Sequence, residues 1–146
     1  MTVLLRAIET SAPTEAVARY LTDFTTAEAW DPGTVSCRRL DEGPVRVGSR
    51  FENVSRFRGR ETTLVYRLTE LVPGVRVTFI GDNKTVTTID DLHFEPLSTG
   101  CRVRYQVDFR FKGLARLAVP FLRPSLEHLA DAGAARMKTV LDALPT

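Results

Sequence analysis

The stretch Lys112–Leu144, KGLARLAVPFLRPSLEHLADAGAARMKTVLDAL, is the only segment long enough for a helix of many turns. Its apolar positions are separated by three or four residues and form one stripe: Leu122, Leu126, Leu129, Gly133, Met137, Val140 and Leu144. This spacing predicts an amphipathic helix with one buried face. A single such helix that follows a run of strands needs a sheet to cover its stripe, so we expect the two to pack together.

Two prolines, Pro120 and Pro124, lie in the first part of this stretch. Each proline disfavours helical geometry in the preceding residue and removes one backbone donor. We therefore expect a break or kink between Val119 and Pro124, with the long helix running from about Pro124 to Ala143. The apolar segment Gly113–Arg123 before it is a candidate lid.

The chain before this stretch has the alternation of strands. In Cys101–Phe111 the apolar residues alternate with Arg102, Arg104 and other polar residues, a period of two that predicts one buried face. Seven strands are predicted: Thr2–Thr10, Val35–Leu40, Val47–Phe57, Thr62–Leu71, Val75–Ile80, Thr85–Phe94 and Cys101–Phe111. Two short helices are predicted between the first two strands, one beginning at Pro13 and one over Thr26–Trp30.

Length and charge limit the class of protein. At 146 residues the chain is expected to form one domain, residues 1–146. A net charge of +2 with 26% charged residues argues against a dedicated nucleic-acid-binding protein. The sequence has no apolar run that could span a bilayer and no signal-peptide hydrophobic region, so we expect a cytoplasmic protein without an integral membrane span.

The residue types that hold metals are few and scattered. Cys37 and Cys101 lie far apart, and His93 and His128 have no cysteine or carboxylate at ligand spacing on the same face. We expect reduced thiols, no metal site and no cofactor. The sequence also lacks a nucleophile elbow, a phosphate-binding loop and a dinucleotide fingerprint.

Several short motifs occur in an order that is more specific than any one of them. They are SAPTEAV (11–17), YLTD (20–23), WDP (30–32), VRVGSRF (45–51), TELVPG (69–74), FEP (94–96) and TGCRV (99–103). In this order they resemble the SRPBCC superfamily of START-like and birch-pollen-allergen-like domains, and more specifically its polyketide cyclase/dehydrase-like branch. The resemblance covers essentially the whole chain.

The resemblance implies an α+β helix-grip fold. In this fold a seven-stranded antiparallel sheet wraps around a long C-terminal helix, with two short helices after the first strand. The resemblance further implies a deep cavity between sheet and helix that binds a hydrophobic small molecule such as a lipid, a sterol or a polyketide. Some members of the superfamily cyclise or aromatise a polyketide in that cavity. Other members act as carriers or receptors.

Alternation along the strands indicates which side chains face such a cavity. Asp90 shares its parity with apolar residues of Thr85–Phe94, which predicts a buried carboxyl with a raised pKa. It would be a general base or a ligand anchor, unless a bulge shifts the register or the carboxyl lies at the rim. Tyr66 and Tyr105 are also expected to face inward, with hydroxyls that bind either a ligand or a core partner.

Polar residues on an inward face give a second indication of a cavity. Phe51, Asn53 and Ser55 share one parity, which is unusual for a closed core and typical of a wet cavity wall. Trp30 either caps the cavity or fills the core. The expected ligand-binding residues are Trp30, Phe51, Asn53, Ser55, Tyr66, Phe79, Thr88, Asp90, Tyr105, Phe109, Leu122, Leu126 and Gly133. The candidate catalytic residues are Asp90 and Tyr66.

Three functions are compatible with these features. The first is binding or transport of a hydrophobic small molecule, and the second is a polyketide cyclase, aromatase or dehydratase that uses Asp90 and a tyrosine. The enzyme hypothesis lacks inward arginines, since Arg67, Arg102 and Arg104 are predicted to point outward. The third is a toxin-like protein-interaction module, for which the basic stretch Arg50–Arg60 would be the surface. Ligand identity and oligomeric state are left open.

Overall fold

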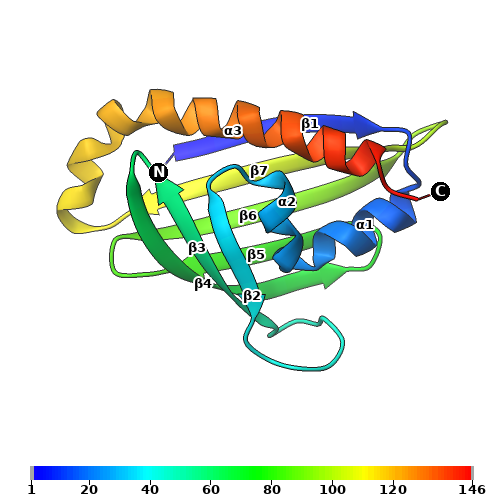
Figure 1. Ribbon diagram of the computed structural model, residues 1–146, viewed down its shortest axis with the longest axis horizontal. Helices are drawn as coiled ribbons and strands as arrows, with labels where there is room; N and C mark the ends of the chain where they lie inside the picture. The colour runs from blue at the N-terminus through cyan, green and yellow to red at the C-terminus, as the bar shows by residue number, and fades with distance from the viewer. Residues whose placement is uncertain (1, 146) are drawn as a thin grey trace.

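The structure, a computed structural model, describes residues 2–145. One strand is followed by two short helices, then by six more strands and finally by one long helix (Figure 1). Its elements in chain order are β1 (Thr2–Thr10), α1 (Thr14–Thr22), η1 (Phe24–Thr26), α2 (Ala27–Trp30), β2 (Thr34–Arg39), β3 (Arg50–Phe57), β4 (Arg60–Val72), β5 (Arg76–Asp82), β6 (Val86–Pro96), β7 (Cys101–Phe111), η2 (Gly113–Ala118) and α3 (Val119–Asp142).

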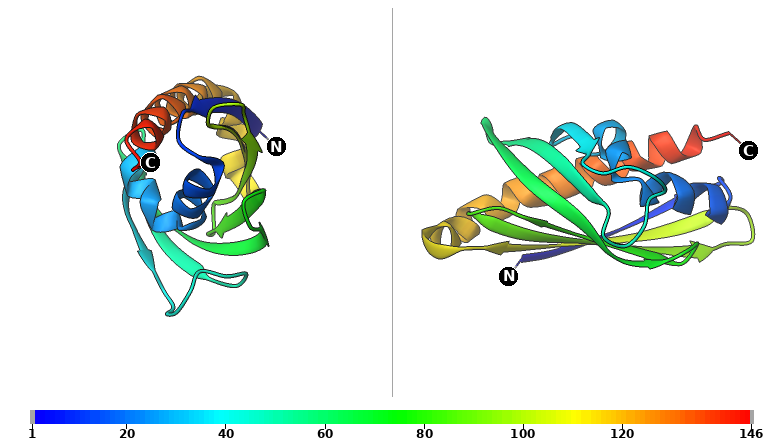
Figure 2. Two further views of the ribbon diagram at one scale, coloured as in Figure 1. Left: turned by 90° about the vertical axis from the view of Figure 1, so that its right-hand side faces the viewer. Right: turned by 90° about the horizontal axis from the view of Figure 1, so that it is seen from below.

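The strands form one antiparallel sheet in the order β1-β7-β6-β5-β4-β3-β2. Seen end on, the sheet curves around α3, while α1 and α2 lie within the same concave side (Figure 2). This is the predicted helix-grip arrangement, and the prediction of seven strands, two short helices and a long C-terminal helix is confirmed. Within residues 2–145, no helix is long and apolar enough to cross a membrane.

The register of β6 determines which of its side chains face α3. This strand pairs continuously with β7, from Val86 opposite Phe111 to Pro96 opposite Cys101. Every second residue from Val86 to Phe94 is buried, as the alternation predicts. Because the register runs without a bulge along this pair, Asp90 keeps its inward parity.

Of the two alternatives expected at the start of the long helix, a break is wrong, because α3 runs continuously from Val119 through Pro124 to Asp142 and begins before Pro124. Pro120 lies in the first turn, where a backbone N–H has no helical acceptor to lose. Pro124 removes the donor that would otherwise bond to the carbonyl of Pro120. Both prolines are exposed, so water is able to solvate that carbonyl and the helix continues.

The two ends of α3 lie in different surroundings. Toward its C-terminus, Met137 and Leu141 are fully buried in the larger apolar cluster, which also contains α1 and the middle of the sheet. Toward its N-terminus, Leu126 joins a smaller cluster with Leu4 and Val107. The helix therefore closes the core at one end and covers a separate apolar region at the other.

The closed core is centred on η1. The ring of Phe24 lies 4.5 Å from that of Phe79 and 6.1 Å from that of Phe51, measured between centroids. Both partners are fully buried. Aromatic rings at these separations fill the space between η1 and the sheet and leave no room for a ligand at this end.

Candidate functional site

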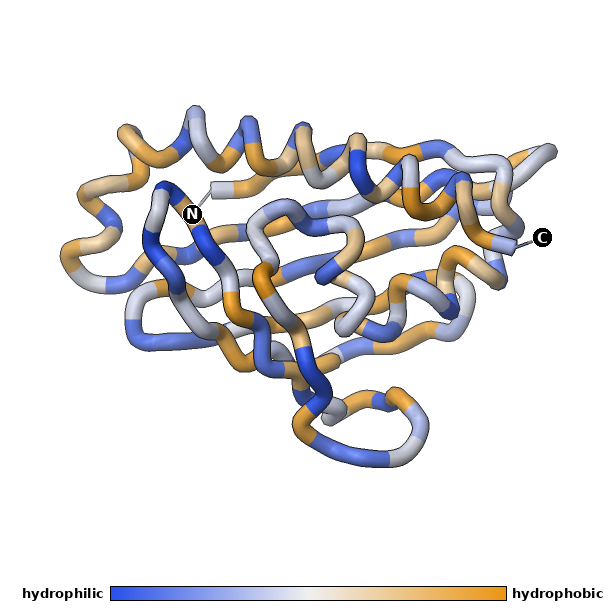
Figure 3. Tube along the Cα trace, in the orientation of Figure 1, coloured by the Kyte–Doolittle hydropathy of each residue, from blue (hydrophilic) through white to orange (hydrophobic). Residues whose placement is uncertain are grey.

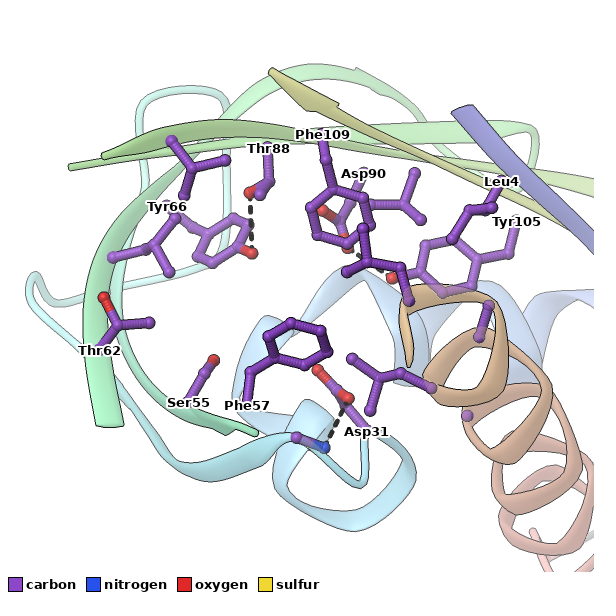
Figure 4. Close-up of a pocket in the computed structure, with 18 of the residues that line it drawn as sticks. Leu4, Asp31, Ser55, Phe57, Thr62, Tyr66, Thr88, Asp90, Tyr105 and Phe109 are labelled. Carbon is purple, nitrogen blue, oxygen red and sulfur yellow. Dashed lines mark hydrogen bonds between the residues drawn. The ribbon is translucent and has the colours of Figure 1, made fainter. Parts of the chain in front are cut away.

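A cavity of about 170 Å³ lies between the sheet and the N-terminal half of α3 (Figure 4). Most of its wall is apolar, with side chains from β1, β4, β6, β7 and α3. Nine of the expected ligand-binding residues line it: Trp30, Ser55, Tyr66, Thr88, Asp90, Tyr105, Phe109, Leu126 and Gly133. For comparison, an apolar cavity of about 150 Å³ holds a benzene molecule.

Four other expected wall residues do not line the cavity. Phe51 and Phe79 are fully buried in the closed core around η1. Asn53 is also buried there, and its amide nitrogen donates to Oγ1 of Thr34 at 3.0 Å. Leu122 is half-buried and packs against the outside of the smaller apolar cluster. Parity places the three strand residues, Phe51, Asn53 and Phe79, on the inner face correctly, but the cavity occupies only part of that face.

Asp90 is a buried polar residue of the wall, with 4% of its surface exposed. Its Oδ2 accepts a hydrogen bond from the Tyr105 hydroxyl at 2.6 Å, and its Oδ1 has no partner among the described residues. Burial raises the pKa of Asp90 to about 7; the Tyr105 hydrogen bond partly offsets this rise, and the charge of Asp31 adds to it. The carboxyl is therefore close to half-protonated at neutral pH.

A second polar pair lies beside Asp90 on the sheet side of the cavity, where Thr88 is two residues before Asp90 on β6. The hydroxyls of Thr88 and Tyr66 are 2.9 Å apart, so Tyr66 bonds to Thr88 and not to Asp90. Burial, together with the charge of Asp90, raises the pKa of Tyr66 well above its ordinary value, and the tyrosine stays neutral. The ring lies directly over β5, where a Cβ on Gly81 would come within 2.7 Å of its Cε1 and Cζ atoms.

Asp31, the second residue of the WDP motif (30–32), also lines the cavity. Its Oδ1 accepts from the backbone N–H of Gly33 at 2.9 Å and its Oδ2 from the Thr34 hydroxyl at 2.9 Å. Desolvation raises the pKa of Asp31 despite these bonds. The sequence did contain a signal for this position, because Asp31 is the neighbour of Trp30, which was already an expected cavity residue.

Trp30 is buried in the larger apolar cluster and also lines the cavity. Its ring meets that of Tyr105 edge to face, with centroids 5.5 Å apart. The indole N–H donates to Oγ1 of Thr26 at 3.3 Å. The only tryptophan of the chain therefore touches the residue that binds Asp90.

The cavity is bordered by two arginines that are already paired. Arg6 on β1 donates to Asp131 at 2.8 Å and to Glu127 at 3.1 Å, both on α3. Arg56 on β3 donates to Glu61 at 3.0 Å. These two guanidinium groups are therefore engaged with acids outside the cavity.

The hairpin between β3 and β4 reaches α3 beside the cavity. At its tip, Nη1 of Arg58 donates to Oγ of Ser125 at 2.9 Å. Arg58 and Gly59 both have positive φ, which gives the tight turn that projects the arginine toward the helix. Phe57, directly before this turn, lines the cavity. The tip therefore forms a bridge from the sheet to the helix.

The arginines that were expected to point outward lie on the surface. Arg67 and Arg104 are exposed, and Arg102 donates to Glu9 and Glu95. None of these three lines the cavity. No group of three or more His, Cys, Asp or Glu side chains that could hold a metal ion occurs among residues 2–145.

Residues 1–142 match the model of a family described as polyketide cyclase / dehydrase and lipid transport. The chain belongs to this family. None of the curated proteins compared with the chain matches it significantly.

Solved structures of low sequence identity share the fold. The Zhui aromatase/cyclase from Streptomyces sp. R1128 is 15% identical and aligns with a TM-score of 0.81 over 97% of this chain and 93% of that one. A START superfamily protein from Mycobacterium smegmatis is 15% identical, with a TM-score of 0.72 over 94% and 98% of the two chains. A protein from Chromobacterium violaceum is 23% identical, with a TM-score of 0.69 over 97% and 98%.

Proposed function

We propose that this protein binds a small hydrophobic molecule in the cavity between the sheet and the N-terminal half of α3. The proposal is supported by the composition of the cavity wall, which is mostly apolar but contains a few polar atoms. Most of the lining is apolar, while the Asp90–Tyr105 and Tyr66–Thr88 pairs place a few polar atoms at defined positions. Apolar burial supplies affinity in such a site, and the polar atoms orient the ligand.

Trp30 provides a direct test, since the only tryptophan lies on the cavity wall. We expect titration with one-ring and two-ring aromatic compounds to change its fluorescence in a saturable manner. Native mass spectrometry of protein purified from its own host is the parallel measurement, and we expect a co-purifying small molecule. Unchanged tryptophan emission across the series, together with a ligand-free mass spectrum, would contradict the proposal.

The segment Gly113–Arg123, which covers η2 and the start of α3, is the proposed lid. Phe111, directly before it, and Leu126, just after it, both line the cavity. Binding is therefore expected to slow amide hydrogen exchange across this segment. Exchange that stays the same in the bound protein would exclude a lid at this position.

One observation favours catalysis in the same cavity as a second candidate function. A carboxyl with a pKa of about 7, bonded to a tyrosine hydroxyl at 2.6 Å, is matched to general acid–base work at neutral pH. In a cyclase or dehydratase, Asp90 would take a proton from carbon next to a ketone, and Tyr105 would hold the carboxyl in place. Tyr66, the expected catalytic tyrosine, would orient the substrate through its hydroxyl.

The enzyme proposal has its own test. Once a substrate is found, Asp90→Asn is expected to lower kcat by at least about a hundredfold, since a general base contributes roughly that much. Binding of the substrate, measured through Trp30, should change far less. Full turnover in the Asp90→Asn protein would remove Asp90 from the mechanism and leave ligand binding as the function.

A further inference from the structure

The Asp90 carboxyl lies on the cavity wall, and one of its two oxygens lacks a hydrogen-bond partner among residues 2–145. Oδ2 is bonded to Tyr105, while Oδ1 is buried and has no hydrogen-bond partner among residues 2–145. A buried polar atom without a partner is costly, and native proteins satisfy nearly all of them. Oδ1 is therefore free to accept a hydrogen bond from a donor group of a molecule that enters the cavity.

The charges around the cavity indicate the sign of that group. Asp31 and Asp90 are the two acids on the wall, and the charge of Asp31 raises the pKa of Asp90. The two cations on the wall, Arg6 and Arg56, are paired with acids that lie outside it. Two carboxyls thus share a largely apolar space, and neither forms an ion pair among residues 2–145.

We infer that the cavity selects a ligand with a protonated amine on a small apolar body, with the amine bound by the Asp90 carboxyl and attracted by Asp31. This rests on the proposed function, since it names the class of ligand for the same cavity. The amine supplies the donor that Oδ1 lacks and compensates a carboxylate that is costly to leave buried alone. The apolar body contacts Leu4, Val107 and Leu126.

The same reasoning disfavours a carboxylic acid such as a fatty acid. A carboxylate ligand would bring a third negative charge beside Asp31 and Asp90, and charges of one sign repel strongly in a water-poor site. Arg6 and Arg56 could bind it only by breaking their ion pairs with Glu127, Asp131 and Glu61. An uncharged alcohol lies between the two classes, because it donates a hydrogen bond without compensating charge.

The pH dependence of amine binding is determined by the charged and titratable side chains that surround Asp90 on the neighbouring elements. They are Tyr105 on β7, Tyr66 on β4, Asp31 after α2, Arg6 on β1, Arg56 on β3 and, acting on Asp31, Arg136 on α3. The tyrosines stay neutral, because burial raises the pKa of both well above the ordinary value, and the arginines stay charged. Asp90 is thus the group whose charge changes near neutral pH, and the amine binds its ionised form.

Three one-ring probes of the same shape test the inference: benzylamine, benzyl alcohol and benzoate. Their Kd values are measured with the intact protein through Trp30 fluorescence at pH 5 and pH 8. At pH 8 we expect the amine to bind at least tenfold more tightly than the alcohol, and the benzoate to bind most weakly. From pH 5 to pH 8 amine affinity should rise by up to about a hundredfold as Asp90 ionises, while alcohol affinity stays flat.

Two variants separate a charge effect from a packing effect. Asp90→Asn is expected to reduce amine affinity to that of the alcohol in the same variant and to remove the pH dependence of amine binding. Tyr105→Phe removes the hydrogen bond that lowers the pKa of Asp90, so the rise in amine affinity should move to higher pH. Both proteins are first compared with the wild type by circular dichroism.

The outcomes distinguish this inference from the proposed function. Equal binding of all three probes, tighter binding of the benzoate, or an amine preference that survives in Asp90→Asn would overturn the amine selectivity and leave ligand binding intact. Failure of all three probes to bind would overturn both.

Discussion

Tyr105 donates its hydroxyl to Oδ2 of Asp90 at 2.6 Å from the neighbouring strand, so the two residues form a fixed pair across the β6–β7 ladder. Asp90 itself lies opposite Val107 in this ladder, two residues beyond Tyr105, and the long tyrosine side chain spans the difference.

The first prediction concerns stability and pH. Because burial raises the pKa of Asp90 from 3.8 to about 7, the folded state holds this proton more tightly than the unfolded state. The protonated Asp90 therefore contributes its full share to the free energy of unfolding below about pH 4. This share is lost as pH rises to about 7, at a cost on the order of a few kcal/mol. The Asp90→Asn protein has no carboxyl to ionise and does not show this loss. The difference in Tm between the variant and the wild type should therefore increase, in favour of the variant, by roughly 5–10 °C from pH 5 to pH 8.

A neighbouring carboxyl serves as the matched control for that measurement. Asp91 is partly desolvated, but hydrogen bonds from Arg76 and Thr78 hold its pKa below the ordinary value. Its stabilising effect is thus present at pH 8 and lost in acid, so Asp91→Asn should lower Tm at pH 8. If both variants shifted Tm in the same direction with pH, the burial of an uncompensated Asp90 would be contradicted.

The second prediction concerns cavity volume. Ala130 on α3 lines the cavity and is half-buried, so Ala130→Phe places a ring inside it. We expect affinity for an aromatic probe to fall at least tenfold by Trp30 fluorescence. Ala135 lies on the exposed face of the same helix, and Ala135→Phe is the control that should leave affinity unchanged. Equal affinity in the two variants would place the ligand elsewhere.

The third prediction concerns Gly81, whose missing side chain leaves space for the Tyr66 ring. A Cβ at this position would lie 2.7 Å from Cε1 and Cζ of Tyr66, closer than real carbon atoms approach. Gly81→Ala should therefore displace the ring, break the Tyr66–Thr88 hydrogen bond and cost roughly 1–3 kcal/mol of stability in denaturant unfolding. Tyr66→Val in the same protein makes room for the new methyl group. A double-mutant cycle should show coupling between the sites, and strictly additive effects would contradict this contact.

The fourth prediction concerns the bridge between Arg58 and Ser125. Ser125→Ala removes the hydroxyl that accepts from Arg58 at 2.9 Å, so the hairpin tip separates from α3 more readily. An exposed hydrogen bond of this kind has a net value of roughly 0.5–1.5 kcal/mol. Ligand dissociation, followed by stopped-flow fluorescence of Trp30, should accelerate by roughly two- to tenfold. Thr139→Ala, elsewhere on the exposed surface of α3, is expected to leave the rate unchanged.

The sequence predicted the fold because periodicity and turn residues are local signals. The alternation of Val86 to Phe94 assigned Asp90 to the inner face, and the continuous register of β6 keeps it there. The continuous helix through Pro124 was missed because two exposed prolines look the same in sequence whether the chain breaks or continues. Only solvation of the carbonyl that Pro124 leaves free distinguishes the two cases.

The candidate site was less predictable, for a reason that is geometric. Parity shows which face a side chain is on, but it does not show where along the strand the cavity ends. Phe51, Asn53 and Phe79 have the predicted parity, yet Phe24 of η1 fills the space above that part of the sheet. Asp31 was overlooked because a turn residue has no periodic context, although it lies next to Trp30.

The division of α3 into two parts separates two kinds of substitution. Changes at Met137 and Leu141 act on the packing that holds the domain together. Changes at Leu129 and Ala130 instead alter the wall of the cavity, and neither residue belongs to the larger apolar cluster. One helix can thus accumulate replacements for a new ligand along its first turns while its last turns keep the domain folded, which makes the scaffold tolerant to redesign of its binding preference.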